Sequence, residues 1–105
     1  MATQVTLVAA LYVNAGHERE FEQFESAAAQ IMARYGGRIE RRIRCDADSD
    51  PAQPFEVHLL TFPDLDSFER YRLDPELARL AELRARAIRA TTVWRGAELK
   101  PYKIE

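Results

Sequence analysis

The sequence contains very little cysteine, histidine and lysine, and it has no long hydrophobic run. Cys45 is the only cysteine, so a disulfide within the chain is excluded and a reducing cytoplasm is the expected compartment. The longest mostly apolar run, Val5–Val13, has nine residues, far fewer than the roughly 20 that a membrane-spanning helix needs. The first residues also lack the basic segment of a secretory signal. We therefore expect a soluble, cytoplasmic protein without a membrane partner.

Several motifs of catalysis and cofactor binding are also missing. The sequence contains no P-loop, no G-x-S-x-G motif and no dinucleotide-binding fingerprint. His17, Cys45 and His58 are scattered and match no zinc-binding spacing. We therefore expect neither a cofactor nor a metal site.

The charge balance disfavours one further class of function. Lys+Arg is 15 and Asp+Glu is 17, which gives a formal net charge of -2, whereas a sequence-independent nucleic-acid binder carries a basic excess. We expect no nucleic-acid partner. Lys100 and Lys103 are the only lysines, and the remaining basic side chains are arginines, which suit bidentate pairing and partly buried sites. Where the arginines lie therefore matters more than their sum.

The sequence does contain alternating segments that predict a β-α-β-β-α-β order. Hydrophobic periodicity and turn residues delimit each segment. The predicted elements are a strand over 5–13, a helix over 17–35, strands over 37–45 and 55–62, a helix from 64 that Asp74-Pro75 interrupts, and a strand over 90–95. A polar loop over 46–54 joins the second and third strands.

This order is that of the ferredoxin-like α+β fold, a four-stranded antiparallel sheet with helices on one face, formed here by a single domain of residues 1–105. The first and third strands are expected in the middle of the sheet. The other sheet face is predicted to be apolar and to carry Val8, Ala10, Tyr12, Leu60, Phe62 and Trp94. Such a face is too apolar to remain in water, so we expect a homodimer that packs two sheets together.

Four segments resemble the dimeric α+β barrel proteins, and in particular the bacterial family called domain of unknown function 1330. They are Phe62–Tyr71, Asp74–Arg84, Val93–Gly96 and the helix-to-strand junction Ala33–Arg38. The resemblance extends over nearly the whole chain and implies a homodimer with a barrel-like interior. It implies no activity, because that family has no agreed one. The wider superfamily includes monooxygenases and isomerases, so the fold does not select the function.

The candidate chemistry lies on the third predicted strand. Glu56 and His58 are two residues apart and therefore point to the same side. A carboxylate beside an imidazole can tune it as a general base, and Arg42 can hold an anionic oxygen of a ligand. We expect Tyr12 and Trp94 on the same face as apolar walls of a ligand site.

Arg84 is a further candidate, because the resembled family tends to place an arginine at this point after a leucine. We expect it to pair across the dimer or to line the mouth of a cavity. Two functions stay open at this point. The first is the binding of a small molecule, such as an aromatic or lactone-like compound, in a cavity between sheet and helices, with cofactor-independent monooxygenase or isomerase chemistry as a variant. The second is a non-catalytic structural or regulatory dimer whose charges contribute only to association.

Overall fold

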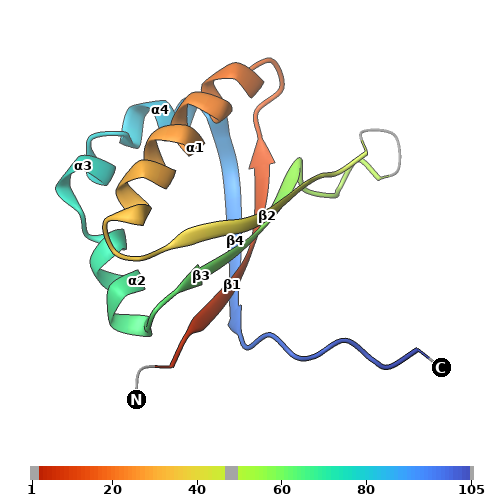
Figure 1. Cartoon of the computed structure of the whole chain (residues 1–105). Coiled ribbons are helices and arrows are strands. Elements are labelled where there is room, and N and C mark those ends of the chain that lie inside the picture. The colour runs from red at the N-terminus through yellow and green to blue at the C-terminus, as the bar shows by residue number, and fades with distance from the viewer. Residues whose placement is uncertain (1–2, 47–49, 105) are drawn as a thin grey trace.

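The computed structural model describes residues 3–46 and 50–104 of the chain, so part of the predicted loop over 46–54 lies outside the described residues. It has the predicted β-α-β-β-α-β order, with the second helical region divided into three short helices (Figure 1). The elements are β1 (Val5–Val13), α1 (Glu18–Ala33), β2 (Arg38–Arg44), β3 (Glu56–Phe62), α2 (Leu65–Arg72), α3 (Pro75–Ala78), α4 (Ala81–Ala87) and β4 (Ile88–Gly96).

The four strands form one antiparallel sheet in the order β2-β3-β1-β4. β1 and β3 are therefore central, as predicted, and all the helices lie on one side of the sheet (Figure 1). This is the ferredoxin-like α+β fold. None of the helices in the described residues is long and apolar enough to span a membrane.

The helices begin where the sequence supplies capping side chains. Asp64 caps α2, because its Oδ1 accepts a hydrogen bond of 2.8 Å from the amide of Ser67. Asp74 caps α3 in the same way, with a bond of 2.7 Å from the amide of Glu76, and Pro75 occupies the first turn, where no amide donor is needed. The Tyr35 hydroxyl also donates to Asp74, at 2.5 Å, and so ties the end of α1 to this turn.

Two adjacent glycines make the turn between α1 and β2 possible. Gly36 has a φ of 75°, in the left-handed region that favours glycine. At Gly37 a Cβ atom would lie 2.4 Å from the ring of Phe62 and 2.5 Å from Met32, so only glycine fits without displacing the core. The turn therefore holds β2 tightly against the hydrophobic core.

The hydrophobic core lies between the helices and one face of the sheet. α1 contributes an apolar stripe at helical spacing, with Phe21, Phe24, Ala28, Ile31 and Met32 buried. Around Phe62 the core is aromatic, because the rings of Phe68 and Tyr71 lie with centroids 5.2 and 5.6 Å from its own. Ala87 and Ile88 bring the junction of α4 and β4 into the same layer.

The register of the sheet overturns one prediction. Ala9 is paired with His58, and Leu11 with Glu56. Because paired residues of antiparallel strands project to the same face, Glu56 and His58 lie on the helix-covered face, with Leu60 and Phe62 beside them. Their predicted place on the opposite face, with Val8, Ala10 and Tyr12, is wrong. The sequence could not decide this, because β3 carries apolar side chains at both parities, Val57 and Leu59 as well as Leu60 and Phe62.

β2 departs from regular alternation in the same way. Its register shifts between Ile39 and Arg41, so Ile39 and Arg42 both project to the helix-covered face. Glu40, two residues before Arg42, accepts a hydrogen bond of 2.9 Å from the Thr61 hydroxyl. The bulge therefore separates Glu40 from Arg42, although the sequence spacing of two residues predicts a shared face.

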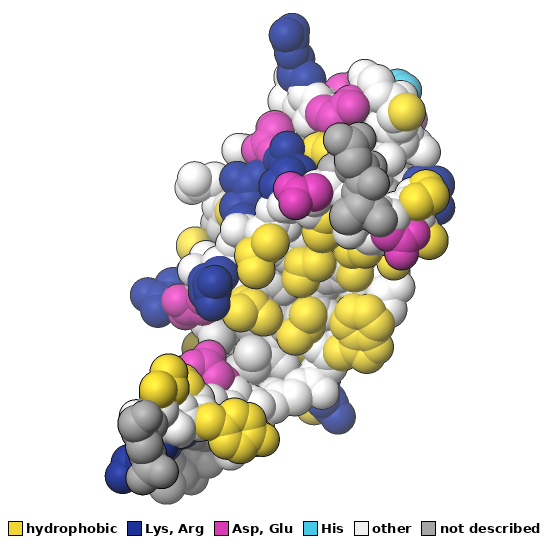
Figure 2. Space-filling model, turned by 90° about the vertical axis from the view of Figure 1, so that its right-hand side faces the viewer, with side chains coloured by type: hydrophobic (Ala, Val, Ile, Leu, Met, Phe, Trp, Pro, Cys, Tyr) yellow, Lys and Arg dark blue, Asp and Glu magenta, His cyan; other side chains and the backbone are white. Residues whose placement is uncertain are grey.

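The other face, which we call the open face, carries no helix (Figure 1). Trp94 is paired with Val8 and is 55% exposed there, so the prediction that both lie on this face is confirmed. The apolar side chains of the open face are Val8, Ala10, Tyr12, Ile43, Val57, Leu59 and Trp94. Figure 2 shows hydrophobic side chains gathered in the middle of this surface.

Candidate functional site

A cavity of about 350 Å³ lies between the sheet and the helices, on the helix-covered side. Its size is at the lower end of the range for small-molecule sites. Most of its lining is apolar and comes from both layers: Ala9, Leu11, Phe24, Met32, Leu60, Phe62, Phe68, Leu77, Ile88 and Val93. A ligand in this space would contact mainly apolar side chains.

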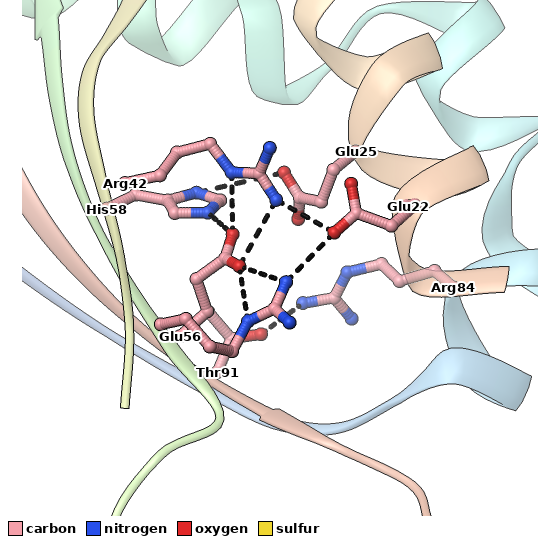
Figure 3. A network of polar contacts seen from close by, with 8 residues as sticks. Glu22, Glu25, Arg42, Glu56, His58, Arg84 and Thr91 are labelled. Carbon is pink, nitrogen blue, oxygen red and sulfur yellow. Dashed lines mark hydrogen bonds and ion pairs between the residues drawn. The ribbon is translucent and has the colours of Figure 1, made fainter. Parts of the chain in front are cut away.

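A few polar side chains converge on this apolar cavity. Glu25, His58 and Tyr71 line it, and Arg84 and Thr91 line it from α4 and β4. The Arg84 Nη2 donates to the Thr91 hydroxyl at 3.1 Å (Figure 3). A small set of oriented polar groups in an apolar cavity is the usual composition of a binding site.

His58 is the central polar group and is only 2% exposed. Its Nε2 lies 2.5 Å from Oε2 of Glu56, and its Nδ1 lies 3.9 Å from Oε2 of Glu25 (Figure 3). When Nε2 carries the proton it donates to Glu56, and the lone pair of Nδ1 then faces Glu25. Glu56 therefore selects the tautomer that leaves a basic nitrogen beside the second carboxyl group.

Glu56 owes its charge to two arginines of β2. Arg42 Nε donates to Oε2 at 2.9 Å, and Arg44 Nη2 donates to Oε1 at 2.7 Å. Burial raises the pKa of Glu56, but the hydrogen bonds from Arg42, His58 and Arg44 outweigh burial and bring the pKa down to about 2. The same bonds to Glu56 raise the pKa of Arg42. Glu56 is therefore a fixed anion behind His58.

Glu22 completes this polar network at the protein surface. Its Oε1 accepts from Nη2 of Arg42 at 2.8 Å and from Nη2 of Arg44 at 3.0 Å. Glu22 is 46% exposed, whereas Glu56 is 2% exposed by the same measure. Two arginines thus join two carboxylates, one in solvent and one buried.

Glu25 has the opposite electrostatic environment. Burial, followed by repulsion from Glu56, raises its pKa to about 7, although the charges of Arg42 and Arg84 lower it in part. A carboxyl group of this kind exchanges a proton near neutral pH and can donate it to a neighbour. Burial, with the charge of Glu25, also raises the pKa of the cavity tyrosine Tyr71 to about 12.

Of the predicted site residues, the structure joins Arg42, Glu56 and His58 in one network and places Arg84 on the wall of the cavity. Tyr12 and Trp94 do not lie on the face of the sheet that carries His58. Because of the register described above, both project from the open face, on the far side of the sheet. The expected shared face is therefore wrong for these two residues.

Glu25 and Arg44 were not predicted as site residues. Glu25 lies four residues after Phe21 and three before Ala28, so it interrupts the apolar stripe of α1, and an acidic residue at such a position is the available signal. Arg44 is two residues after Arg42 and shares its face. The described residues contain no group of three or more His, Cys, Asp and Glu side chains that could hold a metal ion.

Comparison with known proteins establishes the fold. No family model and no curated protein matches the chain, so the resemblance to domain of unknown function 1330 is not confirmed. A solved structure of a protein of unknown function from Rhodopseudomonas palustris matches with a TM-score of 0.79 and 13% identity, over 96% of this chain and 86% of that chain.

Two further solved structures are similar over most of their lengths. SnoaB, a cofactor-independent oxygenase from Streptomyces nogalater, matches with a TM-score of 0.71 and 20% identity, over 95% of this chain and 97% of its own. A dimeric protein of unknown function with a ferredoxin-like fold, from Bacteroides fragilis, matches with a TM-score of 0.66 and 12% identity, over 91% and 98%. The TM-scores support a shared ferredoxin-like fold, whereas the low identities do not support a shared activity.

Proposed function

We propose that this protein binds a small, largely apolar molecule in the cavity and that His58 acts on it as a general base. One observation carries the proposal: His58 borders an apolar cavity of about 350 Å³ with one ring nitrogen held by Glu56 and the other facing Glu25. Such an arrangement orients a base and keeps bulk water away from it.

The proposed step is a proton transfer. Nδ1 of His58 accepts a proton from an acidic C–H or O–H bond of the ligand, which keeps the electron pair as an enolate or phenolate. Glu56 stabilises the imidazolium that forms and acts as a positioning residue, because it contacts His58 and does not line the cavity. The neutral form of Glu25 can return a proton to the ligand, after which His58 recharges Glu25.

The same base serves two reaction classes. In an isomerase the proton returns to a different atom of the ligand. In a cofactor-independent monooxygenase the ligand anion itself reduces O₂: its carbon adds O₂ to form a peroxide, which loses water and leaves one oxygen atom on the ligand as a carbonyl group. SnoaB, whose fold is similar, is a cofactor-independent oxygenase. Oxygen uptake by an active preparation would distinguish them, since isomerisation consumes none.

The test uses 2-tetralone, an apolar bicyclic ketone with acidic C–H bonds. We expect it to bind and to exchange those hydrogens for deuterium faster with the wild-type protein than in buffer, as measured by NMR. His58→Gln should abolish the acceleration and retain binding.

Val93→Trp, which fills the cavity from a half-exposed position on β4, should abolish both binding and the acceleration of exchange. Gln23→Trp, on the exposed side of α1, is the matched control. Equal binding by the Val93→Trp variant would overturn the proposal.

We further propose that two copies associate through the open face. The support is its exposed apolar surface, with Ile43 at 47% and Trp94 at 55% exposure, together with a fold neighbour that is dimeric. Trp94→Asp should then give a monomer in sedimentation experiments. Leu73→Asp, an equally large change at an exposed leucine on the helical side, should leave the dimer intact. A wild-type monomer at micromolar concentration would contradict the proposal.

A structural or regulatory dimer without a ligand is the second candidate. One observation favours it: Arg42, Arg44, Glu22 and Glu56 satisfy one another, as in a purely structural network. This second candidate predicts that 2-tetralone does not bind. It also predicts that His58→Gln changes the stability of the protein and has no effect on hydrogen exchange of the ligand.

A further inference from the structure

A second hollow adjoins the cavity and opens to solvent between α2 and β4. It shares Phe68, Arg72, Arg84, Thr91 and Val93 with the cavity, so the two lie side by side. We call this hollow the arginine groove, because three arginines line it: Arg72, Arg84 and Arg95. It is the solvent-facing hollow next to the cavity that His58 borders.

The fold brings these arginines together from three separate elements. Arg95 is paired with Leu7 and so lies on the helix-covered side of β4. Thr91 and Val93 precede it at intervals of two and share that side. Arg72 ends α2, and Arg84 lies in the last turn of α4. No run of basic residues in the sequence marks the groove.

Two of the three guanidinium groups of the groove form no ion pair with a carboxylate. Within the described residues, the Thr91 hydroxyl is the only hydrogen-bond partner of Arg84, whose charge also acts on Glu25 in the adjoining cavity, and Arg95 has no hydrogen bond or ion pair. Arg72 approaches Glu69, but at 3.5 Å, longer than a strong ion pair. Glu69 is also the only carboxylate that lines the groove.

The arginines of β2 have a different environment. Arg42 and Arg44 share two carboxylates at distances of 2.7 to 3.2 Å. The groove has three cations for one weakly engaged anion, although the whole chain has a formal net charge of -2. A local cationic excess beside an apolar cavity attracts an anion that carries an apolar body.

We infer that the ligand of the cavity is an apolar carboxylic acid, whose carboxylate binds Arg84 with Arg95 and Arg72 while its apolar part lies in the cavity next to His58. This inference rests on the proposed function and specifies its ligand. A carboxylate matches the planar fork of a guanidinium group, so Arg84 can bind it through two parallel hydrogen bonds.

The test compares two probes with the same ring system, 2-naphthoate and the neutral 2-naphthalenemethanol, by isothermal titration calorimetry. We expect the acid to bind about tenfold more tightly or better, since it adds charge-assisted hydrogen bonds. Arg84→Gln should remove that preference and leave the alcohol unchanged, and Arg95→Gln should reduce it. Arg86→Gln is the matched control, because Arg86 is also on α4 but donates to Glu20, away from the groove.

The outcomes separate the two proposals. If the alcohol binds as well as the acid, or if Arg84→Gln retains the preference, the carboxylate inference is wrong and the cavity remains a ligand site. If neither probe binds, the proposed function fails and the inference fails with it. If inorganic phosphate at the same concentration displaces 2-naphthoate completely, the groove binds any oxyanion and the commitment to a carboxylate is wrong.

Discussion

Two glutamates, Glu56 fully buried and Glu25 largely withdrawn from solvent, lie on opposite sides of His58, and they differ in charge for a reason that the structure makes plain. Glu56 contacts two arginines, and its pKa falls to about 2. The Glu25 side chain is 13% exposed, but it lacks such a contact, and its pKa rises to about 7. Burial penalises the charge of both groups, so the placement of cations decides which one ionises.

The difference gives the two ring nitrogens of His58 different environments. On one side a permanent anion holds Nε2, and on the other a carboxyl group that titrates near neutrality faces Nδ1. Pairs of acidic groups with pKa values pushed apart are typical of sites of acid–base chemistry. The comparison predicts that substituting Glu56 and substituting Glu25 change the stability of the protein, and its dependence on pH, in different ways.

The largest effect is expected from Glu56→Gln. The change removes the buried anion that Arg42, Arg44 and His58 share, and it leaves an amide that cannot accept all of their hydrogen bonds. We expect the free energy of unfolding to fall by about 2–4 kcal/mol, because the arginines are half-exposed and regain some hydration. Urea unfolding at neutral pH measures the loss, and a loss of less than about 0.5 kcal/mol would contradict the role given to Glu56.

The second prediction concerns pH. The folded pKa of Glu25 is about 7 against an ordinary value of 4.5, so the folded state holds a proton that the unfolded state releases. The stability that this proton contributes is therefore fully present below pH 4.5 and is lost as pH rises through 7, and it amounts to roughly 3 kcal/mol. Glu56 acts in the opposite sense: its lowered pKa stabilises the fold above pH 4.5, and this contribution is lost as pH falls toward 2.

Glu25→Gln isolates the first of these two effects. The variant should lose the decline between pH 4.5 and 7 while retaining the acid-induced loss that Glu56 causes. Thermal unfolding at a series of pH values, for wild type and variant side by side, is the measurement. Parallel curves for the two proteins would show that Glu25 titrates normally, and the contrast between the glutamates would then disappear.

The sequence predicted the parts of this arrangement that local pattern controls. The buried stripe of α1 and the capping role of Asp64 both follow from spacing and residue type. The pairing of Glu56 with His58 on one side also followed from the period of a strand. The face of the sheet on which the pair lies did not follow from the sequence, because Leu59 and Leu60 make both faces of β3 apolar.

The rest depends on contacts between segments that are far apart in the chain. The bulge between Ile39 and Arg41 decides which β2 side chains reach Glu56, and no residue in that segment marks it. The raised pKa of Glu25 needs the burial supplied by other elements and the charge of Glu56, 31 positions later. The cavity is the space that remains between the packed sheet and helices, so it can be seen only in the folded structure.

The smallest effect is expected from Glu22→Gln, and it tests whether burial gives Glu56 its strength. Glu22 accepts from the same two arginines, at 2.8 and 3.0 Å, but it is 46% exposed. Exposed ion pairs contribute about 0–1 kcal/mol and are screened by salt, so the loss in urea unfolding should be near 0.5 kcal/mol and should vanish at about 1 M salt. A loss as large as that of Glu56→Gln, insensitive to salt, would mean that the two carboxylates and two arginines act as one unit. The buried position of Glu56 would then not be what distinguishes it.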